Sequence, residues 1–552
     1  MASSPSPSLE IVPLGGLGEV GMNCMTLEIE GSMVILDCGV TFPGGHLGVN
    51  LIHPTLDHIV TRRQHVDALL ITHGHEDHIG AIPFLMRALG DDMPPICAPP
   101  YAIELIKRRI GEFNDLKQPE YRPTERGQSF VVGEFEVEPY RVNHSTPGST
   151  GLILRTAAGI VVHSGDFKIE ETPPPGEPFD ADRLRRLADE EGVDLLMSDS
   201  TNVDNQGRSG NELDAATALD TLVGEAKHRI IIALFASNVY RMRGAFEAAK
   251  KHHRKVLLLG RSVENHAFVA RQLGHIRGFD NIIVSAEQAR RIPRDQLLVI
   301  ATGTQGERPA ALGRLSRGDH RYLDIEEGDT VVLSSRIIPG QEKSVFDLID
   351  ALERRGVRVI DRKSNPGVHV SGHACQVEQA ELIRMADPEA FVAVHGTYHM
   401  MRAHSAIARQ EGVHSVLLAE NGVKFELQHG ELKVTGQVPT GRVHIAHKQE
   451  VDEQMLKDRA LASELGTAIV AFSIRDGRLV GMPEIETRGF LRADLEGELC
   501  DEAVDYLVSD LRKNKNLDPA SAEDCARRAV KRFFGRRIGR KPLVVALAVD
   551  VP

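Results

Sequence analysis

The stretch DALLITHGHEDH, residues 67–78, joins an apolar run to a dense group of polar side chains. Its first half, DALLIT, has the length and composition of a buried β-strand, and an apolar helical segment follows the motif. The second half places His73, His75, Asp77 and His78 within six residues. Burying these side chains would be costly unless they were coordinated. The stretch therefore predicts a metal site at the carboxyl end of a strand, rather than a polar loop with chance histidines.

The arrangement of ligands within the motif indicates two metal ions. His73 and His75 can face one cation. Asp77 and His78 can turn toward a second, because the chain changes direction between the two pairs. Two divalent ions about 3.5–4 Å apart are a common device for polarising a phosphate and generating hydroxide. Imidazole and carboxylate ligands without thiolate favour zinc, so we expect two Zn²⁺ per chain, with Mn²⁺ or Mg²⁺ as supporting ions.

Composition places the chain among folded globular proteins. Its 552 residues are 41% hydrophobic and 26% charged, which excludes global disorder and predicts about three to four domains. The net charge of −13 argues against binding nucleic acid by bulk electrostatics but permits a local basic groove. No apolar run reaches membrane-spanning length, and the N-terminal residues lack the features of a signal peptide. With six cysteines and no CxxC pair, these features predict a cytoplasmic protein with reduced thiols and no membrane association.

Changes in pattern along the chain predict the domain organisation. Residues 9–210 read as strands with interspersed helices, which is typical of a packed α/β sandwich. Residues 211–364 alternate helices with apolar strands, which predicts a parallel, doubly wound sheet. Histidine-rich segments return in residues 365–440, so we expect this part to complete the first domain and 211–364 to be an insertion. A linker over 441–460 and a small α/β domain over 461–552 would follow.

The C-terminal domain contains a basic segment within and after a helix predicted over Ala520–Phe534. No acidic residue interrupts it between positions 527 and 541. A solvated helix face is the favoured interpretation, and contact with RNA or an acidic partner is the alternative. The basic residues are Arg527, Arg528, Lys531, Arg532, Arg536, Arg537, Arg540 and Lys541.

The HxHxDH motif after a strand resembles the signature of the metallo-β-lactamase superfamily. Further elements of that superfamily follow in order: Asp37 at the end of MVILD, His144 in VNHSTPGS, Asp166 in HSGDFK and His395 in AVHG. The resemblance implies an αββα sandwich. It also implies that Asp166 bridges the two metal ions and that Asp37 supports the histidine loop. By the same resemblance, one zinc is held by His73, His75 and His144, and the other by Asp77, His78 and His395.

The predicted insertion resembles the β-CASP domain of nucleases in this superfamily. DSTN (Asp199–Asn202) corresponds to the first β-CASP motif, SGHA (Ser371–Ala374) to the second, and His395 to the third. The segments FASN, GRS, ATGTQGE and SRIIPGQE closely resemble bacterial ribonuclease J. The resemblance covers about residues 9–440, and the C-terminal domain fits the same family. It implies single-stranded RNA as substrate, a homodimer or homotetramer, and partners in RNA degradation.

The resemblance also implies which residues act on the substrate. His373 would lie near the phosphate, with Asp199 beside it to raise its pKa, which suits a general acid. Phosphate binding without proton transfer is the alternative for His373. Asp77 counts among the catalytic residues as a metal ligand. A pocket for the 5′-phosphate would be formed by Ser237, His369, Ser371, Gly372, His373 and Ala374.

The backbone amides of the Ser371–Ala374 turn can form an anion-binding concavity, although an ordinary turn is the alternative. One segment departs from the family pattern. Where bacterial ribonuclease J commonly has Glu-Tyr-Arg after His-Gly, this chain has Thr397, Tyr398 and His399. That difference leaves the metal ligand unchanged and puts only the local network around it in question.

Together, these features predict a zinc-dependent ribonuclease that acts in RNA maturation and mRNA decay. We expect 5′-to-3′ exonuclease activity that favours 5′-monophosphate ends, together with endonuclease activity. A DNA-acting β-CASP nuclease and a small-molecule metallohydrolase of the same superfamily are the alternatives. A catalytically silent scaffold is disfavoured, because all the ligand positions are occupied by ligand residues.

Overall fold

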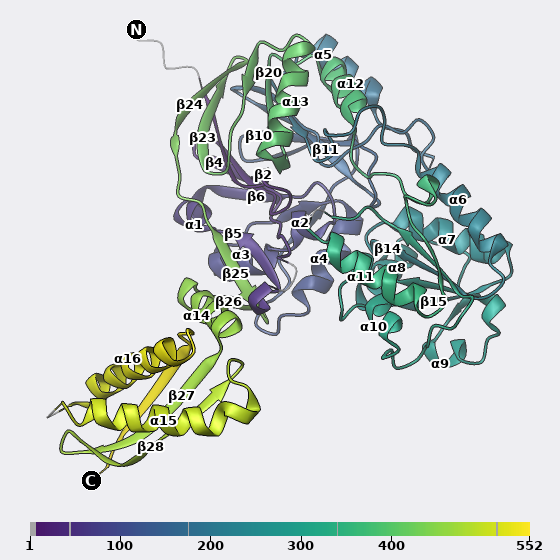
Figure 1. Ribbon diagram of the computed structural model, residues 1–552. Helices are drawn as coiled ribbons and strands as arrows, with labels where there is room; N and C mark the ends of the chain where they lie inside the picture. The colour runs from purple at the N-terminus through teal and green to yellow at the C-terminus, as the bar shows by residue number, and fades with distance from the viewer. Residues whose placement is uncertain (1–6, 44–45, 175, 339, 515–516, 552) are drawn as a thin grey trace, which may run out of the picture. The chain divides into compact units, whose positions relative to one another are not determined.

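The computed structural model describes residues 7–43, 46–174, 176–338, 340–514 and 517–551. The chain divides into two compact units (Figure 1). The larger comprises Met1–Thr41 and Ile52–Arg442, and the smaller comprises Phe42–Leu51 and Val443–Pro552.

The larger unit contains two mixed β-sheets that supply its main core. The first has the strand order β24 (Glu431–Gln437), β23 (Val423–Gln428), β1 (Leu9–Gly15), β3 (Cys24–Ile29), β4 (Ser32–Leu36), β6 (Val66–Leu70), β7 (Ile96–Ala98) and β8 (Tyr121–Pro123). The second has the order β22 (Ser415–Leu417), β20 (Ala390–Val394), β13 (Leu195–Asp199), β12 (Gly159–His163), β11 (Thr150–Thr156), β10 (Phe135–Arg141) and β9 (Phe130–Val132).

Side chains from both sheets meet in one buried cluster. Leu27 and Val34 of the first sheet and Leu154 and Val161 of the second belong to it, and all four are fully buried. Beside the first sheet lie α3 (Ile82–Leu89) and α4 (Pro100–Ile110), and beside the second lie α5 (Ala181–Glu190), α12 (Gln376–Ala386) and α13 (Tyr398–Gln410). The predicted αββα sandwich is therefore confirmed.

A third sheet, of six parallel strands, lies between β13 and β20 in the sequence. Its order is β16 (Ile283–Val284), β15 (Lys255–Leu259), β17 (Leu297–Ala301), β14 (Ile230–Leu234), β18 (Thr330–Ser334) and β19 (Arg358–Ile360). The connecting helices include α6 (Glu212–Glu225), α7 (Val239–Lys251), α8 (Arg261–Gln272), α10 (Ala311–Arg317) and α11 (Glu342–Glu353). Strands β14, β17 and β18 are buried along their whole length, as expected of parallel strands covered on both faces. The predicted parallel insertion is confirmed.

The smaller unit is built on a three-stranded sheet ordered β28 (Arg478–Arg488), β27 (Thr467–Arg475) and β29 (Leu543–Asp550). One face packs on α15 (Ala493–Leu511) and α16 (Pro519–Arg537), around a core that includes Val470 and Phe534. The segment 441–460, interpreted from the sequence as a linker, contains β25 (Arg442–Ala446), β26 (Gln449–Val451) and the start of α14 (Glu453–Leu465).

Four of the eight basic residues of the segment within and after α16 pair with acidic residues of their own unit. Arg532 contacts Asp510 at 2.7 Å, and Arg537 contacts Glu502 at 2.9 Å. Arg528 pairs with Asp524 one turn earlier on the same helix, at 2.6 Å. These ion pairs favour the interpretation of the segment as a solvated helix face. Over the described residues, no helix combines the length and apolar character needed to cross a membrane.

Candidate metal centre and active site

The HGHEDH motif begins just after β6, at the end of the first sheet. His73 and His75 lie on the loop, and the short helix α2 (Glu76–Ile79) carries Asp77 and His78. The amide of Cys38 donates to the carbonyl oxygen of His78 at 2.7 Å and holds the helix against the end of β4. Gly39 makes this approach possible, because a Cβ there would lie 1.6 Å from the carbonyl oxygen of Asp77.

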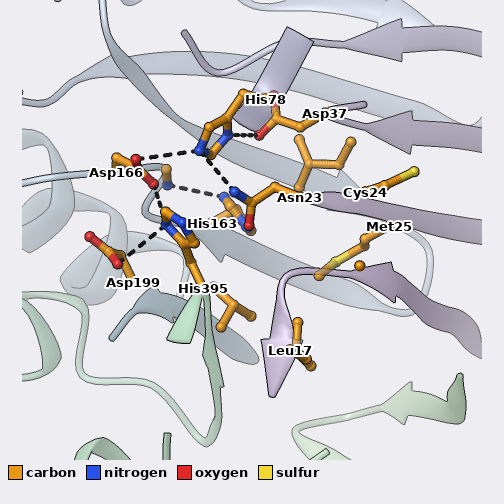
Figure 2. Close-up of a pocket in the computed structure, with 14 residues that line it drawn as sticks. Leu17, Asn23, Cys24, Met25, Asp37, His78, His163, Asp166, Asp199 and His395 are labelled. Carbon is orange, nitrogen blue, oxygen red and sulfur yellow. Dashed lines mark hydrogen bonds and ion pairs between the residues drawn. The ribbon is translucent and has the colours of Figure 1, made fainter. Parts of the chain in front are cut away.

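The structure brings all seven predicted metal ligands together in two overlapping sets, each with ligand atoms within 4.8 Å of one another, and a third such set joins Asp166 and His395 to Asp199 and His373. The sets share Asp166, whose Oδ2 lies 3.3 Å from His78 Nε2 (Figure 2). The same oxygen lies 3.5 Å from His73 Nε2. Asp166 Oδ1 is 2.8 Å from His395 Nδ1. The first set is His73, His75, His144 and Asp166, and the second is Asp77, His78, Asp166 and His395.

Buried atoms without partners show that this donor set fits divalent cations. Asp166 Oδ2, His73 Nε2 and His395 Nε2 are buried and have no hydrogen-bond partner among the described residues. Leaving buried polar atoms unpaired costs about 1–3 kcal/mol each. A cation within reach of these atoms would remove that cost, and the mixture of imidazole and carboxylate matches the ligands of zinc.

The electrostatics differ between the two sets. Burial lowers the pKa of His75 to about 3 and that of His144 to about 4, so both imidazoles are neutral, the form that binds metal. Burial also disfavours the charged form of His395, but the carboxylates of Asp166 and Asp77 raise its pKa to about 10. The second set therefore attracts positive charge strongly, as a cation site requires.

Asp37 lies behind the second set and orients His78. It follows β4 in the left-handed backbone region, at φ 57°, and its carboxylate accepts from His78 Nδ1 at 2.8 Å. The same carboxylate accepts from the amide and the hydroxyl of Thr72, both at 2.9 Å. This leaves His78 Nε2 directed toward Asp166. Such outer carboxylates set the orientation and basicity of a ligating histidine.

His373 and Asp199 form a pair beside the metal ligands. His373 Nδ1 donates to Asp199 Oδ2 at 2.7 Å, and Asp199 Oδ1 accepts from the hydroxyl of Thr201 at 2.7 Å. Burial opposes protonation of His373, but Asp199 outweighs it and raises the pKa of the imidazole. Asp199 and His395 come together because β13 and β20 are parallel neighbours and end side by side, with Asp199 opposite Val394.

The Ser371–Ala374 turn is only partly open to a phosphate. Ser371 Oγ accepts from the amide of His373 at 3.1 Å, and the amide of Ala374 donates to the carbonyl oxygen of Phe167 at 2.7 Å. These two amides, predicted from the sequence to bind phosphate, already have partners within the protein. Donors at this turn without a partner among the described residues include the Ser371 hydroxyl, the Gly372 amide and His373 Nε2.

The other two predicted phosphate-binding residues lie at the inserted domain. Ser237 is half-buried on the loop between β14 and α7, and in the described part of the chain no hydrogen bond joins it to the turn. His369 lies against Arg241, with Nδ1 3.5 Å from Nη1, and burial lowers the pKa of His369 to about 3. His369 is therefore an uncharged contact rather than a cationic phosphate ligand.

Several contributors were not predicted from the sequence. The side-chain amide of Asn23 lies 3.0 Å from His78 Nε2. Arg241 is 1% exposed, pairs with Glu212 at 2.7 Å and donates to the carbonyl oxygen of Val368 at 3.2 Å. The bond to Val368 holds the segment that leads into Ser371. No local motif marks these residues, because their partners lie far away in the sequence.

Two of the residues that depart from the family pattern after His395, Thr397 and His399, take part in a local hydrogen-bond network. Thr397 Oγ1 lies 2.9 Å from His399 Nδ1, and His399 Nε2 lies 3.2 Å from Asp204 Oδ2. The His399 side chain is 62% exposed, so these contacts are at the surface and leave the position of His395 to the end of β20.

Comparisons with known proteins agree with this geometry. Family models match as follows: a beta-lactamase superfamily domain over residues 33–254, a ribonuclease J beta-CASP domain over 227–352, a Zn-dependent metallo-hydrolase RNA specificity domain over 365–418, and a ribonuclease J C-terminal domain over 454–551. The chain is 38% identical to ribonuclease J of Mycobacterium tuberculosis, over 99% of this chain and 98% of the relative. The chain belongs to the ribonuclease J family.

A second relative supports the same family, and one solved structure shares the fold. Ribonuclease J of Corynebacterium glutamicum is 37% identical over 99% of this chain and 77% of its own length. A protein of unknown function from Enterococcus faecalis shares the fold at a TM-score of 0.55 and 16% identity, covering 76% of this chain and 100% of that structure. The resemblance to bacterial ribonuclease J drawn from the sequence motifs is confirmed.

Proposed function

We propose that this ribonuclease J family member is a zinc-dependent ribonuclease that hydrolyses RNA phosphodiester bonds. The carboxylate of Asp166, shared between two sets of ligand atoms, is the observation that carries this proposal. A shared carboxylate suits a pair of divalent ions, and paired ions are a common device of phosphodiesterases. Two Zn²⁺ per chain, with Mn²⁺ or Mg²⁺ as supporting ions, would fill the site.

Different groups have different roles in the proposed hydrolysis of the phosphodiester bond. When bound, the metal ions would polarise the phosphate and make hydroxide available at neutral pH. His373 lies beside the ligands with Nδ1 held by Asp199, which leaves Nε2 as the atom that can give a proton to the leaving oxygen. Asp199 raises the pKa of His373 against the opposing effect of burial, which favours the protonated imidazole. The Ser371 hydroxyl and the Gly372 amide would hold the 5′-phosphate.

The proposal also includes the direction in which the RNA is degraded. An exonuclease needs a closed pocket that holds a terminal phosphate at a constant distance from the ligands. The donors at the Ser371–Ala374 turn suit a monophosphate, whereas a triphosphate adds charge and bulk. We propose 5′-to-3′ degradation that favours monophosphorylated ends, together with internal cleavage, in RNA maturation and mRNA decay in the cytoplasm.

Self-association is also part of the proposal. The face of the C-terminal sheet away from α15 and α16 exposes a row of apolar side chains, with Leu547 56% exposed and Met482 62% exposed. A second copy of the chain covering this face, in a homodimer or homotetramer, would remove it from water. Partners in RNA degradation belong to the proposal as well, although the basic segment of α16 does not by itself support them.

The test is digestion of single-stranded RNA with three different 5′ ends by the purified, zinc-loaded protein. We expect monophosphorylated RNA to be degraded faster than triphosphorylated or hydroxyl RNA, and mass spectrometry to find about two zinc ions per chain. Single-stranded DNA and a thioester serve as the other substrates. Hydrolysis of the thioester or the DNA but not of RNA would replace this proposal with one of its alternatives.

A further inference from the structure

A second pocket, separate from the metal ligands, lies in the six-stranded parallel sheet. It has a volume of about 350 Å³ and is lined by residues that follow β17, β18 and β19 and by residues of α11. Helix α11 is labelled in Figure 1. Ligands of open α/β sheets bind outside the carboxyl ends of the strands. Small-molecule sites have volumes of about 300–1,000 Å³. Both the position and the size of this pocket are those of a ligand site.

The lining of the pocket is positively charged. Arg336, Arg362 and Lys363 supply three cations, and Asp361 is the one acidic lining residue. Asp361 Oδ1 accepts from the amides of Lys363 at 3.1 Å and Ser364 at 2.9 Å, so it caps its own turn. Over the described residues, no carboxylate forms an ion pair with Arg362 or Lys363. These two cations are therefore available to an anion.

The remaining lining is suited to a flat apolar group. Next to the pocket residue Val345 on α11, the Phe346 ring is 46% exposed, and the Lys363 ammonium lies 5.2 Å from its centroid. Proteins that bind single-stranded nucleic acids combine such exposed rings, on which bases stack, with cations that follow the backbone. The apolar lining residues are Leu333, Ile337, Val345 and Ile349.

Buried contacts hold one side of the pocket in shape. Gln305 is 4% exposed, and its side-chain amide donates to the carbonyl oxygen of Arg336 at 2.9 Å. Its oxygen accepts from the amide of Ile338 at 2.8 Å. The loop after β18 is therefore tied at both ends of Ile337, which places that side chain and Arg336 before any ligand arrives.

One chain of hydrogen bonds connects this pocket to the active site. Arg336 Nη1 donates to Asn202 Oδ1 at 3.1 Å, and Asn202 Nδ2 donates to the carbonyl oxygen of His373 at 3.1 Å. Asn202 therefore bridges the pocket residue Arg336 and the Ser371–Ala374 turn. An extended strand with its reacting phosphate at that turn would have its neighbouring nucleotides close enough to enter the pocket.

We infer that this pocket is a subsite for one nucleotide of the RNA strand. The base would lie against the apolar lining and Phe346, and the phosphate would contact Arg362 and Lys363. The inference rests on the proposed function, since it places the strand by way of His373. A free nucleoside monophosphate offers the same chemical groups, and the connection to the active site is what favours a nucleotide of the strand.

The test compares Arg362→Ala/Lys363→Ala with Lys343→Ala/Arg354→Ala in the full-length, zinc-loaded protein. The control removes two positive charges from α11 and the residue that follows it, at side chains that are 89% and 76% exposed and lie outside the pocket. For a ten-nucleotide RNA, we expect the pocket variant to raise KM about tenfold with kcat unchanged, because two charged groups no longer meet the substrate. The slope of log KM against log salt should fall by about 0.7 for each phosphate that the variant no longer neutralises.

Two further measurements identify the source of the nucleotide. RNA carrying 4-thiouridine is cross-linked to the wild-type protein, and we expect adducts at residues 345–349 or 361–363, reduced in the pocket variant. Calorimetry with adenosine and uridine monophosphates should show only weak binding. Tight binding of free monophosphate that the pocket variant abolishes, with KM for RNA unchanged, would overturn the strand assignment.

Equal effects of the two double variants would overturn the subsite altogether. Failure of the wild-type protein to cleave any RNA would instead contradict the proposed function. In that case cross-linking and binding of RNA would still report on the pocket.

Discussion

The carboxylate of Asp166 and the imidazole of His78 lie at the centre of the ligand arrangement. Asp166 belongs to both ligand sets, whereas His78 belongs to one and is held from behind by Asp37. Removing Asp166 would therefore disturb both cation positions, and removing His78 should disturb one. That asymmetry makes His78 the better residue for testing whether the centre holds two ions.

His78→Ala should lower the zinc content from about two ions per chain to about one and reduce RNA hydrolysis at least a hundredfold. The fold should persist, because the apolar core between the two sheets does not depend on this side chain. Zinc is measured by mass spectrometry and folding by circular dichroism. His65→Ala, at a histidine with 46% side-chain exposure that pairs with Glu28, serves as the control. Unchanged turnover in His78→Ala would contradict a dinuclear centre.

Asp199→Asn tests whether His373 donates a proton. The change removes the carboxylate that holds His373 Nδ1, so kcat on RNA should fall about 10²–10⁴-fold while zinc content is retained. A p-nitrophenyl phosphodiester has a leaving group that needs no proton, and its hydrolysis should be affected far less. Equal losses on both substrates would favour phosphate binding as the role of His373.

Ser371→Ala probes the hydroxyl at the proposed 5′-phosphate pocket. The Ser371 oxygen accepts from the amide of His373, which leaves its proton to meet a phosphate. A charge-assisted hydrogen bond contributes about 1.5–3 kcal/mol, so the exonuclease rate on monophosphorylated RNA should fall about tenfold or more. Cleavage of a circular RNA, which has no 5′ end, should stay nearly the same. Equal losses on linear and circular RNA would exclude a role specific to the 5′ end.

At the scale of elements, the buried pair of Arg241 and Glu212 joins α7 to α6 and to the segment before Ser371. Arg241 Nε lies 2.7 Å from Glu212 Oε1, and Nη1 donates to Ser334 Oγ at 2.7 Å. Removing one partner from such a pair costs about 3–5 kcal/mol, because the other charge is left buried and unpaired. A buried ion pair therefore helps to hold the inserted domain to the segment before Ser371, at a position where apolar contacts are more usual.

Glu212→Gln should lower the midpoint of urea unfolding at neutral pH, and the loss relative to wild type should shrink in acid. Burial disfavours the ionised carboxylate, but Arg241 outweighs it and lowers the pKa of Glu212. A lowered pKa in the folded state stabilises the protein above the unfolded pKa of about 4.3, and this stabilisation is lost as pH falls through the folded value. Glu247→Gln, at an exposed i,i+4 pair with Arg243, is the control. A pH-independent difference would exclude ionisation of Glu212 as the cause.

The elements show what could and could not be predicted from the sequence. Apolar periodicity predicts a strand over Thr330–Ser335 and a helix over Ser344–Arg355, and both lie within two residues of the observed ends of β18 and α11, because periodicity is a local signal. The gathering of the seven ligands was implied by the order of the motifs, and the structure brings these residues together. Asn23 and Arg241 could not be predicted, since their contacts depend on how distant segments pack.

At the scale of the whole molecule, the C-terminal sheet leaves apolar side chains on both of its faces. Strand β29 alternates Val544, which is 4% exposed, with outward residues such as Val545 and Leu547, which are 51% and 56% exposed. In a monomer, these apolar side chains would stay exposed to water. We expect this face to be covered by another copy of the chain.

Val545→Asp/Leu547→Asp should convert the protein to a smaller species in light scattering, with zinc content unchanged. Charged residues on this face would have to be buried at the interface, which is costly. Deletion of residues 451–552 should have the same effect on mass. Val434→Asp on β24, where valine is 51% exposed, is the matched control. A wild-type protein that is already monomeric, or a variant of unchanged mass, would contradict this role of the sheet.

The pairing of β13 with β20 has a consequence for how the protein is made. The two strands are neighbours in the second sheet, yet residues 200–389 are synthesised between them. At about 5–20 residues per second, a ribosome needs about 10–40 s to cover that distance. During this time β13 presents an unpaired edge and His395 has not been made, so the second ligand set cannot be completed. The nascent chain is therefore exposed to aggregation until the last part of its first domain emerges, and early chaperone contact with residues 195–199 would be its natural protection.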